Sequence, residues 1–156
     1  MTKNISIFIV ATLSTLSLFC QDILLQEYKN DAFEFLYPKK WTIDSSDNPR
    51  VSFYYNATLG DITISIYKNK ALSDKELKKL LLEINNKKEL HPDIKILTTD
   101  GQTNCTYNYT SDKIKYFIKA IKKGNNLYLV SLNWQEKSWD TFKDLLLKSF
   151  DSFQPK

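Results

Sequence analysis

The chain has 156 residues, a length that predicts a single domain. Hydrophobic residues make up 42% and charged residues 26% of it, a balance that excludes a disordered or collagen-like chain. One histidine and two cysteines exclude most zinc sites and any disulfide-stapled scaffold. The net charge is +4, and Arg50 is the sole arginine among 22 basic residues. These numbers predict a domain held together by an ordinary hydrophobic core.

Residues 1–20 differ from the remainder of the chain. Lys3 is the only charge among them, and Ile5–Phe19 is a fifteen-residue run of apolar residues and small hydroxyls. A short basic start followed by such a run is typical of a secretory signal peptide. A retained N-terminal anchor is the alternative, but a membrane-spanning helix needs about 20 apolar residues. We therefore expect an exported protein, periplasmic or secreted, with a single domain over 21–156.

The end of the signal leaves two interpretations open. Signal peptidase could cut after Cys20, so that the mature chain would begin at Gln21. Alternatively, Cys20 could carry a lipid and tether the protein to a membrane as a lipoprotein. Lipoprotein signals prefer a small residue before the cysteine, and Phe19 is large, so plain cleavage is favoured. Contact with a membrane is expected only if Cys20 is lipidated.

The first part of the mature chain predicts short strands. Ile62, Ile64 and Ile66 alternate strictly with polar residues, which is typical of a strand with one buried face. Pro38 ends an earlier strand because proline has no N–H to give to a ladder. Similar patterns predict the strands 24–28, 32–37, 41–43, 51–56 and 61–67.

The period then changes to that of a helix. Ser73 and Glu76 have the spacing of a capping box, in which each side chain satisfies a backbone N–H near the start of the helix. An apolar stripe follows at helical spacing, formed by Leu77, Leu80, Leu81 and Ile84. The pattern predicts a helix over about 74–89, and Pro92 ends it.

Four more strands and a second helix complete the chain. Asp100-Gly101 is a strong hairpin signal, and short turns make the strands 94–98, 103–110, 114–120 and 127–134 an antiparallel meander. Ser138 is expected to cap a last helix whose buried side is marked by Phe142, Leu145, Leu146, Ser149 and Phe150. The sum is an α+β domain, an antiparallel sheet of six to eight strands packed with two main helices.

Two short motifs fall at the ends of this arrangement. YPKKW (Tyr37–Trp41) follows the early aromatic strand, and KSFDSF (Lys148–Phe153) closes the last helix. With the order of elements between them, the region 32–153 resembles the PsbP-like family, which includes small exported bacterial proteins of the DcrB type. The resemblance implies an α/β/α sandwich and a docking or binding role. It carries over no residue-level function.

The sequence contains few residues that could form a catalytic site. His91 lies between Leu90 and Pro92 at a predicted helix end and is read as an exposed helix-terminal residue. Cys105 shares a strand face with tyrosines and is read as a buried, inert thiol, with thiol-dependent activity at Cys105 as the alternative. The DSSD segment (Asp44–Asp47) lacks a calcium-loop pattern. We expect no enzyme, and no catalytic, cofactor-binding or metal-binding residue is predicted.

The lysines are densest in one strand and its turns, at Lys113, Lys115, Lys119, Lys122 and Lys123. Nucleic-acid recognition would call for clustered charge and for arginine, whereas the charge of this chain is diffuse and arginine is nearly absent. We interpret the run as a solvated row or one that protects a sheet edge, and expect no nucleic-acid partner.

One polar pattern suggests a binding surface. Tyrosine, threonine, serine and asparagine recur on the non-apolar side of several strands, at Ser52, Tyr54, Thr63, Ser65, Tyr67, Asn104, Thr106 and Asn108. If those strands are neighbours, the residues form one weakly charged surface suited to recognising a protein or a glycan. An ordinary wetted sheet face is the alternative. The hypothesis is an exported, non-enzymatic domain that docks to an unknown envelope protein or glycan.

Overall fold

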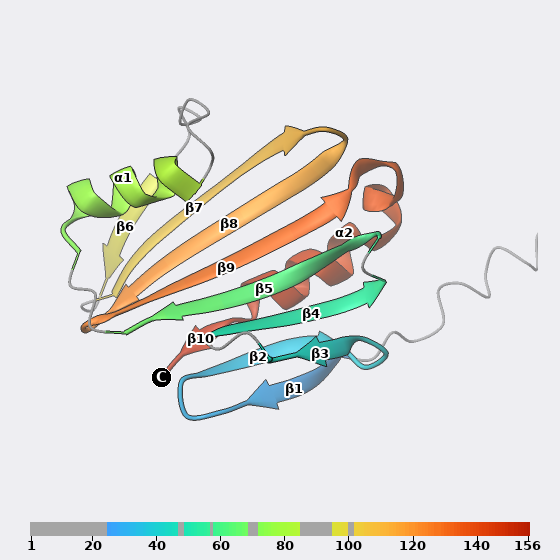
Figure 1. The fold of residues 1–156 in the computed structure, drawn as a ribbon, viewed down its shortest axis with the longest axis horizontal. Coiled ribbons are helices and arrows are strands. Elements are labelled where there is room, and N and C mark those ends of the chain that lie inside the picture. Colours follow the sequence, from blue (N-terminus) through green and yellow to red (C-terminus); the bar gives the residue numbers. More distant parts are fainter. Residues whose placement is uncertain (1–24, 47–48, 57, 69–71, 85–94, 100–101) are drawn as a thin grey trace, which may run out of the picture.

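The computed structural model describes residues 25–46, 49–56, 58–68, 72–84, 95–99 and 102–156 (Figure 1). The larger sheet has seven antiparallel strands, in the spatial order β3 (Thr42–Asp44), β4 (Arg50–Asn56), β5 (Gly60–Tyr67), β9 (Asn126–Gln135), β8 (Ile114–Lys123), β7 (Gln102–Ser111) and β6 (Lys95–Thr99). A smaller antiparallel sheet has the order β1 (Leu25–Lys29), β2 (Phe33–Pro38) and β10 (Gln154–Pro155). The helices are α1 (Asp74–Ile84) and α2 (Glu136–Asp151).

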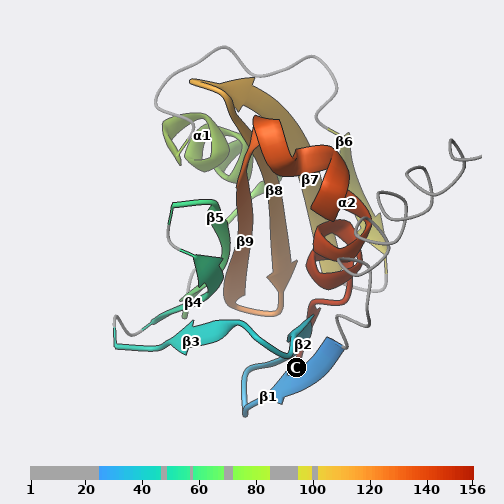
Figure 2. The same ribbon diagram turned by 90° about the vertical axis from the view of Figure 1, so that its right-hand side faces the viewer.

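The two helices lie on opposite faces of the large sheet (Figure 2). One face, here called the α2 face, is covered by α2 and by the smaller sheet, which together enclose Ile62, Ile64 and Leu132. On the opposite face, the α1 face, α1 is the one helix among the described residues, and it covers part of that face. This three-layer arrangement confirms the predicted α+β class and the α/β/α sandwich.

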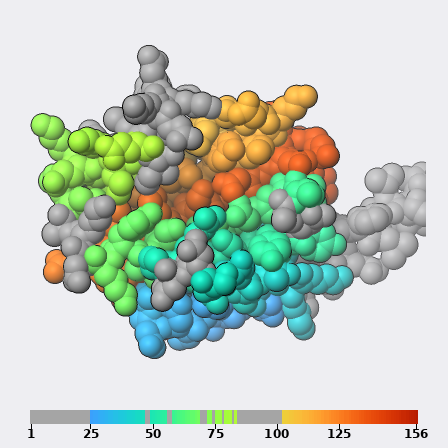
Figure 3. Space-filling model, viewed as in Figure 1, coloured from blue at the N-terminus to red at the C-terminus, as the bar shows by residue number. Residues whose placement is uncertain are grey.

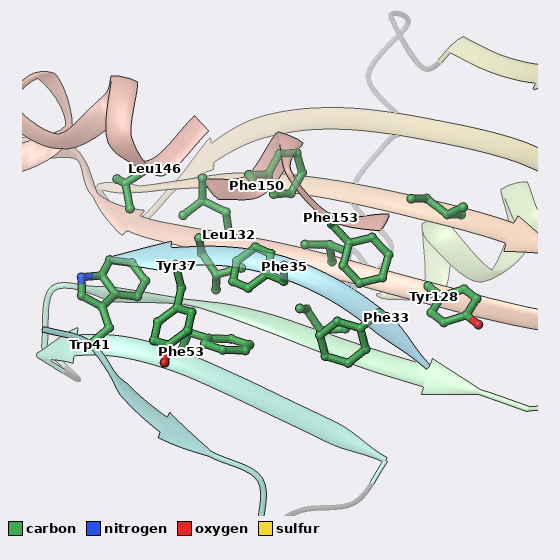
Figure 4. Close-up of a cluster of buried hydrophobic side chains, with 14 of the residues drawn as sticks. Phe33, Phe35, Tyr37, Trp41, Phe53, Tyr128, Leu132, Leu146, Phe150 and Phe153 are labelled. Atoms are coloured by element: carbon green, nitrogen blue, oxygen red, sulfur yellow. The ribbon is translucent and has the colours of Figure 1, made fainter. Parts of the chain in front are cut away.

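The main core joins the smaller sheet to β4 through aromatic rings (Figure 4). The fully buried ring of Phe53 lies 4.8 Å from that of Phe35 and 5.1 Å from that of Tyr37, measured between centroids. Trp41 stacks on Trp134 at 5.8 Å with the two planes 6° apart. The early aromatic strand and the YPKKW motif thus supply core contacts between the two sheets.

A second core cluster lies beneath α1. Leu77 and Leu81 are fully buried against β7, β8 and β9, where Cys105 and Ala120 are among their neighbours. The predicted capping box is present: Ser73 N–H donates to Glu76 Oε2 at 2.8 Å, and Glu76 N–H donates to Ser73 Oγ at 3.3 Å. The hydroxyl and the backbone N–H of Ser73 both donate to the Glu76 carboxylate, and these two bonds lower its pKa.

Several boundaries differ from the sequence expectation. The sequence predicts one sheet, but β1 and β2 form a separate sheet with the unpredicted β10. Helix α2 begins at Glu136 rather than after Ser138, because Glu136 N–H donates to Lys113 O of the neighbouring hairpin. Helix α1 is described to Ile84, and the remainder of the predicted 74–89 helix lies outside the described residues. No helix within those residues is long and apolar enough to cross a membrane.

The lysine run does not protect a sheet edge, which corrects that expectation, and it is solvated only in part, at the exposed Lys113 and Lys123. Strand β8 lies inside the sheet, between β9 and β7. Lys119 Nζ donates to Phe150 O at 3.1 Å and lies 3.0 Å from Asp151 Oδ1, while Lys123 Nζ donates to Pro155 O at 2.9 Å. These lysines hold the end of α2 and the C-terminal strand against the sheet.

Candidate functional site

The part of the α1 face that no described helix covers is polar. Register partners in an antiparallel sheet have their side chains on the same face, so the pairs of β4, β5 and β9 place one set of polar side chains together. We call this set the polar face: Arg50, Ser52, Tyr54, Asp61, Thr63, Ser65, Tyr67, Ser131 and Asn133. Figure 3 views the molecule from this side, with the sheet visible between α1 and the β4–β5 hairpin.

Two short series of hydrogen bonds cross the polar face, and both end at the carboxylate of Asp61. Thr63 Oγ1 donates to Asp61 Oδ2 at 2.8 Å and shares a 3.2 Å hydrogen bond with Ser52 Oγ. On the other side, Asn133 Nδ2 donates to Asp61 Oδ1, and Ser131 Oγ donates to Asn133 Oδ1 at 3.2 Å. Because the Thr63 proton goes to the carboxylate, Ser52 is the donor to Thr63.

The electrostatics of Asp61 follow from its position in the middle of this network. Burial raises the pKa of its carboxyl, and the hydrogen bonds from Thr63 and Asn133 together with the charge of Arg50 oppose that rise. Arg50 itself is exposed, at the start of β4. The site therefore pairs a partly buried negative group with a solvent-accessible cation.

Beside this network the surface is hollowed. The hollow has a volume of about 240 Å³ and is lined by polar side chains of β4, β5 and β9 and by two apolar ones at the edge of the cluster under α1: Arg50, Thr63, Ser65, Tyr67, Ser131, Asn133, Ile118 and Leu129. Thr63 is 7% exposed, so its position is fixed by the surrounding sheet. Tyr67 is 38% exposed at the end of β5.

A stack of tyrosines continues the α1 face toward β7. The rings of Tyr109 and Tyr116 lie 4.7 Å apart with their planes at 9°, and those of Tyr107 and Tyr109 lie 6.2 Å apart at 12°. Burial raises the pKa of both Tyr107 and Tyr109. Tyr116 pairs in register with Asn133, so the stack borders the polar face.

The predicted polar surface is divided by the fold. Ser52, Tyr54, Thr63, Ser65 and Tyr67 do lie together on the polar face. In contrast, β9 and β8 separate β7 from β5, and the register turns three further predicted residues to the α2 face: Asn104, Thr106 and Asn108. The single surface proposed from the sequence is therefore wrong in that half.

Sequence reasoning missed the residues that organise the site. Asp61 is in phase with Thr63 and Ser65, so the alternation of β5 could have included it. Ser131 and Asn133 lie in β9, where most of the other residues are apolar and hide the polar alternation. Arg50 was visible only as the sole arginine of the chain.

Of the other candidate reactive or metal-binding residues singled out from the sequence, the structure describes Cys105 and Asp44. Cys105 is 1% exposed beneath α1, as a buried thiol should be. Asp44, on the neighbouring strand β3, pairs in register with Ser52, so it borders the polar face, and it accepts hydrogen bonds from the backbone N–H and the hydroxyl of Ser46 in a local turn. His91 and Cys20 lie outside the described residues, within which no cluster of potential metal ligands occurs.

The fold is similar to two solved structures. Cyanobacterial PsbP (CyanoP) from Synechocystis sp. PCC 6803 matches with a TM-score of 0.64 and 20% identity, over 88% of this chain and 95% of that chain. A protein from Bacteroides thetaiotaomicron VPI-5482 matches with a TM-score of 0.51 and 14% identity, over 80% of this chain and 45% of that chain. No family model and no curated protein matches the sequence. At these identities the likeness shows the fold alone, and it confirms the expected PsbP-like architecture.

Proposed function

We propose that this PsbP-like domain is an exported, non-enzymatic protein that binds another component of the cell envelope through its polar face. The observation that carries the proposal is the hollow beside Asp61, lined by hydrogen-bonded side chains on the part of the sheet that no described helix covers. Polar groups held in place by one another lose little conformational entropy when a partner binds.

Binding is favoured over catalysis by the way these groups are used. The Thr63 hydroxyl proton goes to Asp61, and the Ser131 proton goes to Asn133. The acceptor of the Ser131 proton is a neutral amide, which cannot act as a base, and the Asp61 carboxylate that accepts the Thr63 proton is also bound by the Asn133 amide. Cys105 is enclosed by the residues under α1, which supports the inert-thiol interpretation over thiol-dependent activity.

Export rests on residues 1–20, and two forms of the mature protein follow from it. Cleavage after Cys20 gives a soluble chain that begins at Gln21, whereas lipidation of Cys20 gives a membrane-tethered chain with the same polar face. Mass spectrometry of the mature N-terminus distinguishes the two. An N-terminus at Gln21 contradicts the tether, and a diacylated Cys20 contradicts plain cleavage.

Removal of two tyrosines from the polar face tests the binding role. The double variant Tyr54→Ser/Tyr67→Ser should lose capture of its envelope component in a pull-down from a cell-envelope fraction. The matched control is Tyr55→Ser, because Tyr55 is 54% exposed and adjacent in sequence but is not part of the polar face. Recovery of every captured component by the double variant, at the level of the control, contradicts the proposal.

A further inference from the structure

We propose that the hollow on the polar face binds a saccharide that carries a carboxylate, such as a uronic acid residue. The inference rests on the proposed function, because it names the chemistry of the envelope component bound there. Three features of the hollow point to this class of ligand: the direction of its hydroxyl protons, the position of its cation and the apolar part of its wall.

The hydrogen-bond chain leaves acceptors at its outer ends. The protons of Ser52 and Thr63 run toward Asp61, and the proton of Ser131 goes to Asn133. A hydroxyl has one proton and two acceptor lone pairs, so the Oγ atom of Ser131, which lines the hollow, can still accept hydrogen bonds from a ligand. The hydroxyl groups of a sugar are suitable donors and can also accept, which matches this wall of the hollow.

Arg50 gives the hollow its selectivity for charge. It lines the hollow, is exposed, and pairs in register with Ser65 across β4 and β5. A guanidinium presents its donors in a planar fork that fits a carboxylate in a bidentate arrangement. The Asp61 carboxylate would repel an anion placed deeply in the hollow, so the ligand carboxylate belongs at the rim beside Arg50, with its hydroxyls inward.

The remaining wall is apolar and aromatic. Tyr67 projects from the end of β5 with 38% of its surface exposed, and Ile118 and Leu129 complete the lining. The C–H face of a pyranose packs on such a surface while its hydroxyls point to the polar wall. The volume of about 240 Å³ lies below the roughly 300–1,000 Å³ typical of drug-sized ligand pockets, which suits one sugar ring with the rest of a glycan outside.

Backbone amide NMR with four small probes tests this inference. Purified protein is titrated with glucuronate, glucose, acetate and galacturonate at equal ionic strength. We expect saturable shifts at Thr63, Ser65, Ser131 and Asn133 with the two uronates. Glucose and acetate should bind about tenfold more weakly or not at all, because each lacks one half of the recognised chemistry.

The variant Arg50→Gln should remove the preference for glucuronate over glucose, lowering glucuronate affinity about tenfold. Lys137→Gln is the control; it removes the same charge from an exposed position on α2 and should leave both affinities unchanged.

Three results overturn the inference: no saturable shift with either uronate, equal affinity for acetate, or an Arg50→Gln variant that binds glucuronate as the unaltered protein does. If these occur while Tyr54→Ser/Tyr67→Ser still abolishes envelope capture, the proposed function stands with a different ligand. If no uronate binds and the unaltered protein captures no envelope component, the inference and the proposed function are both contradicted.

Discussion

Asp61 and Asn133 are register partners on β5 and β9, and the Asn133 amide donates to the Asp61 carboxylate across the two strands. Ser52 and Thr63 complete the network on one side and Ser131 on the other. One partly buried carboxylate thus orients side chains from three adjacent strands. The polar face has a fixed arrangement for this reason, although it lies on the less covered side of the sheet.

The raised pKa of Asp61 makes a pH-dependent contribution to stability. Burial favours the protonated form in the folded chain, so the folded pKa lies above the value of 3.8 for an unperturbed carboxyl. The protonated Asp61 carboxyl therefore contributes to the stability of the folded chain below pH 3.8, and this contribution is lost as the pH rises through the folded pKa. In the variant Asp61→Asn the side chain at position 61 does not titrate. The stability of this variant relative to the unaltered protein should therefore increase from pH 3 to pH 7.

Chemical denaturation at a series of pH values measures this difference. Asp140→Asn serves as the control, because Asp140 is a largely exposed carboxylate on α2. A stability difference between Asp61→Asn and the unaltered protein that stays constant over this pH range, or that falls, contradicts the assigned effect of burial.

Gly60 is required where β5 passes β9. Its φ is +148°, and a Cβ built there would lie 2.1 Å from Asn133 O and 2.8 Å from Trp134 Cα. We expect Gly60→Ala to lower the free energy of unfolding by about 3 kcal/mol, at the upper end of overpacking costs. Gly124 is the control, with φ +56° and open space around the added Cβ, so Gly124→Ala should cost only about 1 kcal/mol. Equal losses by thermal or urea denaturation contradict the steric account.

Phe53 links the two sheets and should be essential for stability. It is fully buried, and its ring contacts those of Tyr28, Phe35 and Tyr37. Phe53→Ala should cost about 3–5 kcal/mol in urea denaturation. Tyr55→Ala, two residues further along the same strand at a 54% exposed position, should stay within about 0.5 kcal/mol. A cost below that of Tyr55→Ala would show that the sheets are not joined there.

Burial predicts that the thiol of Cys105 reacts slowly with alkylating reagents. Cys105 is 1% exposed beneath Leu77 and Leu81. Alkylation at neutral pH, followed by mass spectrometry of the peptide that contains Cys105, should show modification only when the protein is unfolded by denaturant. Rapid modification of the native protein would instead support the alternative of thiol-dependent activity.

Local patterns predicted the elements well, because period and capping are properties of neighbouring residues. The alternation at Ile62, Ile64 and Ile66 confirms this, with exposures of 0%, 0% and 9%. Ser73 likewise caps α1 as its spacing with Glu76 predicted. In contrast, β10 has only two residues, one of them Pro155, and no local pattern distinguishes so short a strand.

The candidate site was less accessible to sequence reasoning because it depends on the order of strands in space. Alternation showed that Thr63 and Asn108 are on polar sides of their strands but not that these sides face opposite directions. Ser138 was read as a helix cap, yet its hydroxyl accepts from Trp134 Nε1 and donates to Gln135 O. These bonds to residues three and four positions earlier take the place of a capping bond at Ser138.

The central claim is that the polar face is the binding surface. Hydroxyl-radical footprinting of the protein, alone and with a cell-envelope fraction, measures it directly because tyrosine rings report their own accessibility. The account predicts that the envelope fraction protects Tyr54 and Tyr67 and leaves Tyr55 unchanged. Protection of Tyr55 alone, with Tyr54 and Tyr67 as reactive as in the isolated protein, would contradict it.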